Sequence, residues 1–472
     1  MFGLDQNTTI LVLICLIAVF AFEFINGFHD TANAVATVIY TNALKPVQAV
    51  VWSGLFNFIG VITGGVAVAM SLLQILDINM LYQQTQMENI ALILAVLITA
   101  IFWNLATWYY GIPSSSSHTL IGSIVGVGIA YNLMLPSETT LIAASINWKK
   151  LTDIGLALLI SPLMGFTITV IVMFTLKKIL KKKKVFKEPK EGGVPPPGVR
   201  ALLIATCTAV SYTHGSNDGQ KGLGLVMILL LAIVPSSFMI NPELTTDDLM
   251  RNTKNVQMQL AQLDSNKIQS EEKAHYLAIN QELSDIQSNA SLLLIKNHDT
   301  KIVKYEIRKS ITHINKEIKF ITGESNGYLK SIFKSEAFTT VVDTLTNHTN
   351  YAPFWAIIMI SLALGVGTMI GWKRIVVTIG EKIGKEHMSY AQGASAEMVT
   401  AISIFTASQL KLPVSTTHLL SSSVAGAMVA ERGIKNLQTS TIKSMALAWL
   451  FTLPVTVIGS GILFWLLKFL IA

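Results

Sequence analysis

Gly27-Phe-His-Asp-Thr-Ala-Asn-Ala34 interrupts one long apolar run of the sequence, and Gly215-Ser-Asn-Asp-Gly-Gln-Lys-Gly222 interrupts another. Each stretch begins at a glycine, has an aspartate three residues later, and a polar residue, Asn33 or Lys221, three residues after that. An ionised aspartate in hydrocarbon costs about 2.5 kcal/mol or more, so such acids usually belong to functional sites. Two of them in matching frames predict an internally duplicated transporter.

The composition is that of a membrane protein. Of the 472 residues, 51% are hydrophobic and only 13% are charged, with a mean hydropathy of +0.53, whereas soluble domains carry about 25% charged residues. Uncharged stretches, most of them long enough to span about 30 Å of hydrocarbon as a helix, recur along the chain: 8–22, 47–76, 90–110, 156–176, 352–372 and 444–467. We therefore predict an all-α polytopic protein with about 10 to 12 membrane segments.

The net charge of +7 does not indicate a nucleic-acid partner. Much of it lies in the run 177–190 beside a membrane segment, where basic residues mark the cytoplasmic side. Cys15 and Cys207 both lie in apolar runs and indicate neither a disulfide nor a metal site. The first apolar segment has no basic leader and no cleavage site, so we expect it to belong to the mature protein.

The chain divides by composition into five parts. We predict a first membrane repeat at 1–180, a basic Pro/Gly-rich linker at 181–200, the start of a second membrane repeat at 201–240, a polar helical extramembrane insert at 241–350 and the remainder of the second repeat at 351–472. The insert is predicted from its charged composition and from apolar residues at helical spacing.

A second internal match supports the duplication. Pro113-Ser-Ser-Ser-Ser-His-Thr-Leu-Ile-Gly-Ser-Ile-Val-Gly126 aligns without gaps on Pro413-Val-Ser-Thr-Thr-His-Leu-Leu-Ser-Ser-Ser-Val-Ala-Gly426. Basic flanks orient the two acidic motifs in opposite directions, the first out-to-in and the second in-to-out, with the insert outside the cytoplasm. These features predict an inverted-topology repeat with broken helices and two re-entrant helical hairpins, which many secondary transporters use.

The two Pro-hydroxyl-His motifs are suited to an oxyanion. Proline favours a helix start, hydroxyls cap exposed N–H groups, and a helix that begins inside the membrane points those groups at a shared centre. The predicted donors to a tetrahedral anion are Ser115, Ser116, Ser117, Ser415, Thr416 and Thr417. His118 and His418 follow at equal positions and either orient these hydroxyls or carry a proton.

The acidic motifs are suited to a coupling cation. Asp30 and Asn33, one turn apart, present oxygens toward a cation, and Glu23 lies about two turns earlier on the same side. In the second copy Asp218 has Lys221 one turn away, so its ammonium stands where a cation would otherwise bind or faces the anion. Asn217 and His29 are predicted to line the same cavity, Asn217 as part of the coupling site. His29 and His214 are predicted to act in support or as proton relays. The glycines of the two motifs are predicted to allow unwound backbone: Gly27, Gly215, Gly219, Gly222 and Gly224.

Together these motifs resemble the PiT family of inorganic phosphate transporters, in particular its bacterial low-affinity branch. The resemblance covers nearly all of the chain outside the insert and extends through Gly365–Trp372 and Ile379–Gly384. It implies phosphate bound near the midplane between the two hydroxyl hairpins, in the bacterial inner membrane, and coupling to protons, with phosphate carried alone or as a neutral complex with a divalent metal. Sodium-coupled members tend to have a GxNDxxNA-like signature in both halves. Here His29 precedes the first aspartate and Lys221 replaces the second asparagine, which fits proton coupling better.

We therefore predict a proton-coupled phosphate symporter that works by alternating access in the lipid bilayer, with no resident cofactor, and that could form a homodimer. A sodium-coupled symporter, or one for another tetrahedral oxyanion such as sulfate, is the alternative. Two alternatives belong to other functional classes. One is a phosphate sensor with the insert as its signalling module, and the other is an intramembrane enzyme that uses His118 or His418. Against the enzyme hypothesis, the sequence has no clear set of nucleophile, base and orienting residue, and an enzyme would leave the duplication unexplained.

Overall fold

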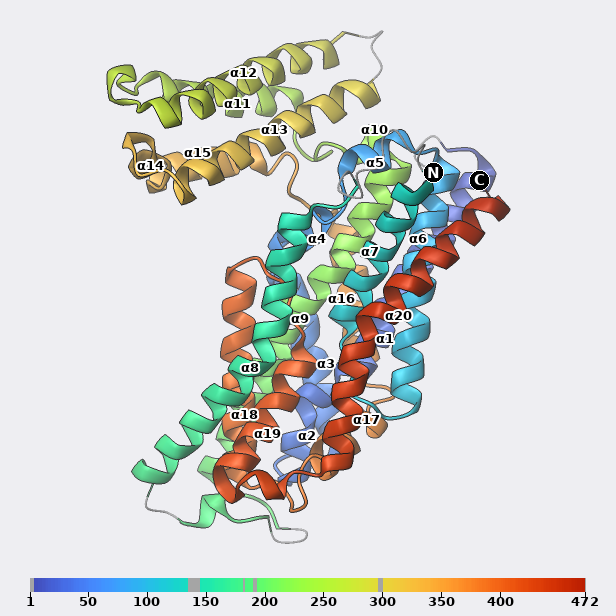
Figure 1. Ribbon diagram of the computed structural model, residues 1–472, viewed down its shortest axis with the longest axis vertical. Coiled ribbons are helices and arrows are strands. Elements are labelled where there is room, and N and C mark those ends of the chain that lie inside the picture. Colours follow the sequence, from blue (N-terminus) through green and yellow to red (C-terminus); the bar gives the residue numbers. More distant parts are fainter. Residues whose placement is uncertain (1–3, 135–144, 181–182, 190–192, 296–299, 472) are drawn as a thin grey trace. The chain divides into compact units, whose positions relative to one another are not determined.

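The computed structural model describes residues 4–134, 145–180, 183–189, 193–295 and 300–471. Within these ranges the chain forms helices and turns and contains no β-strand, which confirms the all-α prediction (Figure 1). Linker residues 181, 182 and 190–192 lie outside the described residues. The chain separates into two compact units, Leu230–Tyr351 and a membrane unit made of Leu4–Leu229 and Ala352–Ala472.

The membrane unit contains helices of membrane length. Six of them are long and apolar enough to cross a membrane, and a bent pair, α16 with residues 373–382, makes seven. Helices α9 and α18 are also long, but polar residues within them lower their hydropathy, so the expected number of about 10 to 12 segments stays a prediction. The helices of this unit are α1 (Gln6–Asp30), α2 (Ala32–Tyr40), α3 (Pro46–Thr63), α4 (Ala67–Leu73), α5 (Ile78–Gln83), α6 (Gln86–Tyr109), α7 (Ser116–Met134), α8 (Trp148–Ile179), α9 (Pro197–Ile233), α16 (Phe354–Thr368), α17 (Lys373–Val377), α18 (Tyr390–Gln409), α19 (Thr416–Arg432) and α20 (Thr439–Ile471).

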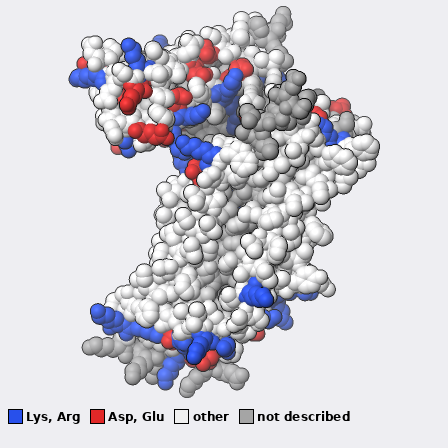
Figure 2. Space-filling model, viewed as in Figure 1, with Lys and Arg blue, Asp and Glu red and all other residues white. Residues whose placement is uncertain are grey.

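The outer surface of the membrane unit is apolar along its length. Large hydrophobic side chains are exposed on α6, α8 and α20, among them Phe102, Leu159 and Leu450. Figure 2 shows that the middle of the visible face of this unit carries no Lys, Arg, Asp or Glu side chain, while charged side chains gather toward its ends. A surface of this kind is stable in lipid and not in water.

The helices of the two sequence halves pack crosswise. Hairpin helix α7 packs against the long helix α20, and its counterpart α19 packs against α8. Small residues allow this close approach, because a methyl group at Gly126 would overlap the carbonyl oxygen of Val457, and one at Gly426 would overlap that of Phe166. Packing between the two halves also joins α1 to α16 and α3 to α9. Each half therefore buries its helices mainly against the other half.

The two hydroxyl motifs follow matching turns. Between α6 and α7 the backbone takes a left-handed conformation at Gly111, with φ +65°, and between α18 and α19 it does so at Lys411, with φ +60°. The amide groups of Ile112 and Leu412 each donate to a carbonyl five residues earlier, at 2.9 Å in both turns. The internal match that the sequence displays is thus also a match of backbone conformation.

The two acidic motifs differ in structure. Helix α1 ends at Asp30, and α2 begins at Ala32 after a break at Thr31. Helix α9 instead continues through Gly215, Asp218 and Gly222 without a break. The prediction of unwound backbone at the second motif is therefore wrong. Its glycines serve close packing, because Gly215 lies against the backbone of α3 and Gly222 lies against Glu23 of α1.

The packing of α9 on α3 can be tested at Gly215. In a Gly215→Ala variant the new methyl group overlaps the carbonyl oxygen of Asn57, and both partners are fixed in helices. Overpacking of this kind costs about 1–3 kcal/mol, so we expect a lower thermal unfolding temperature in detergent. Gly155→Ala is the matched control, because nothing lies within 4 Å of its methyl group inside α8 and alanine favours the helix. An unchanged unfolding temperature in Gly155→Ala and Gly215→Ala alike would contradict this packing.

The unit Leu230–Tyr351 has a hydrophobic core of its own. Its helices are amphipathic, with buried Leu and Ile at helical spacing, such as Ile279, Leu283 and Ile286, and charged residues on their outer faces. Most of the described part of the polar segment 241–350 is therefore helical and packs around this core, while its place outside the membrane stays a prediction. Its helices are α10 (Pro235–Phe238), α11 (Thr246–Ala261), α12 (Ser270–Leu293), α13 (Thr300–Gly323), α14 (Tyr328–Phe333) and α15 (Glu336–Thr346).

Candidate functional site

Asp30 stands at the break between α1 and α2, where hydroxyl groups from both hairpins meet its carboxylate. Thr417 donates to Oδ1 at 2.8 Å, and Ser116 and Thr416 donate to Oδ2 at 3.2 and 3.4 Å. His29 Nδ1 lies 2.9 Å from Oδ1 on the other side. The carboxylate is 1% exposed, so these contacts replace its hydration. Residues from separate parts of the chain thus converge on one side chain.

Lys221 provides the positive charge of the site. Its ammonium lies 2.7 Å from Asp218 Oδ1 and donates to Ser117 Oγ at 2.5 Å and to the Val414 carbonyl oxygen at 3.3 Å. Both charged side chains are at most 1% exposed. A buried charge is tolerated when it is paired and hydrogen-bonded. The Lys221 ammonium meets both conditions, whereas the two carboxylate oxygens of Asp218 are paired with it but have no hydrogen-bond partner among the described residues. Lys221 therefore joins α9 to the start of α7 and to the turn that precedes α19.

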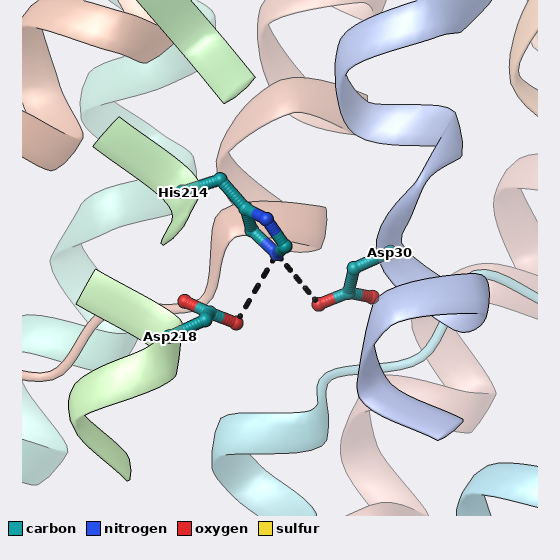
Figure 3. A group of neighbouring side chains, drawn as sticks. All are labelled: Asp30, His214 and Asp218. Carbon is teal, nitrogen blue, oxygen red and sulfur yellow. Dashed lines mark ion pairs between the residues drawn. The ribbon is translucent and has the colours of Figure 1, made fainter. Parts of the chain in front are cut away.

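His214 lies between the two aspartates of the internal repeat (Figure 3). Its Nε2 atom is 3.7 Å from Asp30 Oδ2 and 3.4 Å from Asp218 Oδ2, and the ring points from α9 toward α1. The ligand atoms of the three residues all lie within 4.8 Å of one another, close enough to hold one cation. His214 thus connects the acidic motif of one half to that of the other.

A chain of hydrogen bonds fixes the state of the His214 ring. Thr368 donates its hydroxyl to the Leu364 carbonyl at 2.8 Å, so its oxygen accepts from Asn57 Nδ2 at 2.9 Å. The Asn57 Oδ1 atom then faces His214 Nδ1 at 3.0 Å, and Nδ1 must be the donor. In the neutral ring Nε2 therefore bears a lone pair that faces two carboxylates. A proton held between Nε2 and one of the two carboxylates, or a cation beside Nε2, makes this arrangement favourable.

The other predicted cavity residues surround this centre. Asn33 donates to Thr417 at 3.1 Å, and Asn217 holds the second turn through Ser408 at 2.9 Å. Glu23 is fully buried and packs against Gly222, next to Lys221 in the chain. Glu23 Oε1 and Asn33 Oδ1 are buried acceptors with no hydrogen-bond partner among the described residues. These two oxygens thus retain unused capacity to accept a hydrogen bond.

The remaining residues of the hydroxyl motifs have structural contacts. Ser115 and Ser415 accept from the amides of His118 and His418 at 3.1 and 3.2 Å, so they cap the starts of α7 and α19 as predicted. Each proline lies three residues before its helix rather than at its first position. The two histidine rings lie 4.6 Å apart, and His418 stacks on Trp449 at 4.0 Å. The two rings therefore lie against each other beside the starts of both hairpin helices.

Sequence reasoning missed two polar residues near the site. Glu397 on α18 is fully buried and accepts hydrogen bonds from Thr206 at 2.5 Å and from Thr37. Asn57 on α3 fixes the His214 ring. Both residues lie in otherwise apolar segments. An acid within an apolar segment usually marks a functional site, and this rule, which identified Asp30 and Asp218, also applied to Glu397. Asn57 has no comparable signal, because an uncharged amide stands out much less than an acid in an apolar segment.

Comparison with known proteins agrees with this arrangement. A family model described as "Phosphate transporter family" matches residues 26–460. The chain is 41% identical to the low-affinity inorganic phosphate transporter of Buchnera aphidicola subsp. Acyrthosiphon pisum (strain APS), covering 99% of this chain and 98% of that protein. It is 38% identical to the low-affinity inorganic phosphate transporter PitA of Escherichia coli (strain K12), covering 99% of both. A solved structure titled "The sodium-dependent phosphate transporter" matches with a TM-score of 0.55 at 19% identity, over 97% of this chain and 99% of that one, which shows a shared fold.

These matches bear out the predicted class of protein. The relatives are named as transporters, which confirms the expectation of a transporter rather than an enzyme. The apolar helices and the bacterial relatives agree with the predicted multi-pass location in the inner membrane. The family match extends over nearly all of the membrane unit and includes both acidic and both hydroxyl motifs. The chain belongs to the phosphate transporter family, as the resemblance of its motifs to the PiT transporters led us to expect.

Proposed function

We propose that this protein carries inorganic phosphate across the inner membrane together with protons. Membership of the phosphate transporter family supports the substrate. Proton coupling is supported by the position of His214 Nε2, which lies 3.7 Å from Asp30 and 3.4 Å from Asp218. A proton on Nε2 turns two repulsive contacts into two attractive ones, which supports this atom as the proton site of our proposal.

The charge balance of the site explains why phosphate needs a co-transported cation. Glu23, Asp30 and Asp218 are three buried acids, and Lys221 is the one buried ammonium that the described residues place beside them. With these groups ionised and neutral histidines the site carries a net charge of about −2, which repels a phosphate anion. Each proton taken up by His214 or by a carboxylate lowers that repulsion. Proton and phosphate binding therefore favour each other, as symport requires.

Asp30 links proton binding to phosphate binding through the hydroxyl groups. Ser116, Thr416 and Thr417 now donate to its carboxylate, although the same donors suit a phosphate oxygen. A proton shared between His214 and Asp30 weakens the hold of the carboxylate on these hydroxyls, and phosphate then takes them over. Lys221, which already contacts Ser117, compensates the charge of the bound anion.

The crosswise packing of the halves supports alternating access. The site lies among α1, α9 and the starts of α7 and α19, which belong to both halves of the internal repeat. Inverted repeats of this type expose a central site to each side in turn by rocking one bundle against the other. The hairpins α6–α7 and α18–α19, with their matching turns, are the parts that we expect to close over phosphate from opposite sides.

A divalent cation is the second candidate for the charge between the aspartates. The nitrogen of His214 and one oxygen each of Asp30 and Asp218 lie within 4.8 Å of one another, which suits a single metal ion. In that case phosphate would cross the membrane with the metal as a neutral complex, and both would be substrates. The ammonium of Lys221 beside Asp218 makes a proton the better match, because it already offsets one carboxylate.

Uptake of labelled phosphate into proteoliposomes tests the proposal. An inside-alkaline pH gradient in sodium-free and magnesium-free buffer should drive uptake, and a proton ionophore should abolish it. A His214→Gln variant should lose the pH dependence of uptake because glutamine cannot take up a proton. His387→Gln, at an exposed histidine, is the matched control and should behave as wild type.

Three outcomes would contradict the proposal. Uptake that requires a sodium gradient and ignores the ionophore would favour sodium coupling. Uptake that occurs only with added magnesium, with labelled metal entering alongside phosphate, would favour the metal complex. Equal inhibition of phosphate uptake by sulfate and by unlabelled phosphate would point to a general oxyanion carrier.

A further inference from the structure

A basic and aromatic cavity lies at the end of α6, beside the bend where α16 gives way to α17. Its volume is about 640 Å³. Its lining includes four aromatic side chains and three cationic ones near the turn at Gly111, and no Asp or Glu among the described residues that border it. These seven residues, which we call the interfacial pocket, are Trp108, Tyr109, Tyr110, Trp372, Lys373, Arg374 and Lys382.

Arg374 is held in place by the pocket itself. Its guanidinium lies 4.9 Å from the ring centre of Tyr109 and 5.1 Å from that of Trp108, and it donates to the Tyr109 carbonyl at 2.7 Å. One hydrogen bond of this kind leaves several of its five N–H donors free. A pre-oriented guanidinium with free donors is the preferred protein partner of a phosphate group.

The positive charges of the pocket are not neutralised within the protein. In the part of the chain that the structure describes, no carboxylate oxygen lies within 4.0 Å of Lys373, Arg374 or Lys382. All three side chains are exposed to the pocket and to its surroundings. Three unpaired cations around one cavity attract an anion, and their mutual repulsion falls when one binds.

The pocket lies where the lipid-facing surface of the protein ends. Phe102 on α6 is 71% exposed and Ile370 after α16 is 52% exposed, so apolar side chains face outward just before the pocket on both segments. Tyr109 and Tyr110 follow, with exposures of 59% and 75%. Exposed tyrosines followed by Lys and Arg mark the depth of lipid headgroups. An anion that reaches this pocket with its apolar part beside Phe102 and Ile370 is an anionic lipid.

From these observations we propose that the interfacial pocket binds the phosphate group of an anionic phospholipid. Arg374 and the two lysines take the phosphate, Tyr109 and Tyr110 border the headgroup, and the acyl chains lie along α6. The chemistry of a free phosphate ion is similar, but a free ion gains nothing from the apolar surface that leads into the pocket. The inference does not depend on the coupling ion proposed above.

The pocket is connected to the candidate transport site by direct contacts. The Trp108 ring packs edge-on against Phe28 at 5.0 Å, and Phe28 precedes His29. Thr378 donates to the carbonyl of Gly111 at 2.7 Å, in the turn that leads to the first hydroxyl motif. A lipid bound here therefore steadies the α6–α7 turn.

Lipid retention by the full-length protein tests the assignment. Purified protein in a neutral detergent would be titrated with phosphatidylglycerol, with phosphatidylcholine or with inorganic phosphate, and bound lipid would be measured by native mass spectrometry. The test variant is Lys373→Gln/Lys382→Gln, which keeps the Arg374 contacts. The control is Lys435→Gln/Lys443→Gln, the same charge change at exposed lysines outside the pocket lining.

We expect wild type and control to bind phosphatidylglycerol in preference to phosphatidylcholine, and the test variant to bind it about 10- to 30-fold more weakly. Arg374→Gln should weaken it further, with the unfolding temperature without lipid used to detect misfolding. Equal phosphatidylglycerol binding by the test variant and the control would overturn the proposal. Displacement of phosphatidylglycerol by millimolar inorganic phosphate would also overturn it, because the pocket would then be a site for the free ion.

Discussion

An Asp30→Asn variant is expected to lose phosphate uptake by about 100-fold or more. The carboxylate of Asp30 accepts from Ser116, Thr416 and Thr417 and faces His29 and His214. The amide cannot take up or share the proton that we propose to lie between His214 and Asp30. A positioned proton-transfer group typically contributes about 100-fold or more to a rate. Initial rates of labelled phosphate uptake into proteoliposomes would measure the loss.

The same variant separates binding from coupling. Since the amide that Asp30→Asn introduces holds the hydroxyls less strongly than a carboxylate does, phosphate binding measured by calorimetry should persist and should depend less on pH than in wild type. Asp153→Asn, at an exposed aspartate on α8, is the matched control for the charge change and should transport normally. Uptake by Asp30→Asn at the wild-type rate and with the wild-type pH dependence would remove Asp30 from the coupling site.

A Lys221→Met variant is expected to be both inactive and unstable. The ammonium lies 2.7 Å from Asp218 and 2.5 Å from Ser117, and it is 1% exposed. Its loss leaves the Asp218 carboxylate buried beside Asp30 with no fixed cation, at a cost of about 3–5 kcal/mol. We expect a clearly lower unfolding temperature and phosphate uptake close to the background of empty liposomes.

Removing both charges distinguishes a structural role of Lys221 from a transport role. The double variant Asp218→Asn/Lys221→Met should regain most of the unfolding temperature, because a buried ion pair replaced as a pair costs little. It should not regain uptake, since phosphate then lacks its fixed cation. Lys178→Met at an exposed lysine is the control for side-chain change alone. Recovery of both stability and uptake in the double variant would leave Lys221 with a structural role only.

Much of the architecture could be predicted from local sequence patterns. Apolar runs predicted helices because lipid offers backbone groups no other partners, and the gapless match of residues 113–126 to 413–426 agrees with the matching turns at Gly111 and Lys411. The continuity of α9 could not be predicted, because a glycine-rich polar motif is compatible with both an unwound and a closely packed helix. The choice depends on Asn57 and Glu23, which lie far away in the sequence.

The candidate site was predictable in its members more than in its contacts. Charge in an apolar setting identified Asp30, Asp218 and Lys221, and the structure brings them together with the hydroxyls of both hairpins. The sequence assigned Ser116, Thr416 and Thr417 to phosphate, whereas here they donate to Asp30. The position of His214 between two carboxylates depends on side chains from separate helices, and no local pattern encodes such a meeting. These roles of single residues remain predictions.

The crosswise packing of α7 on α20 and of α19 on α8 has a consequence for how the chain is made. Helix α7 emerges from the ribosome long before α20, the last helix that the structure describes. The glycine-lined face of α7 therefore has no α20 to pack against until α20 has been made. A chain that stops before α20 therefore leaves that face uncovered. The interface between α7 and α20 can form only after the last of these helices has been synthesised.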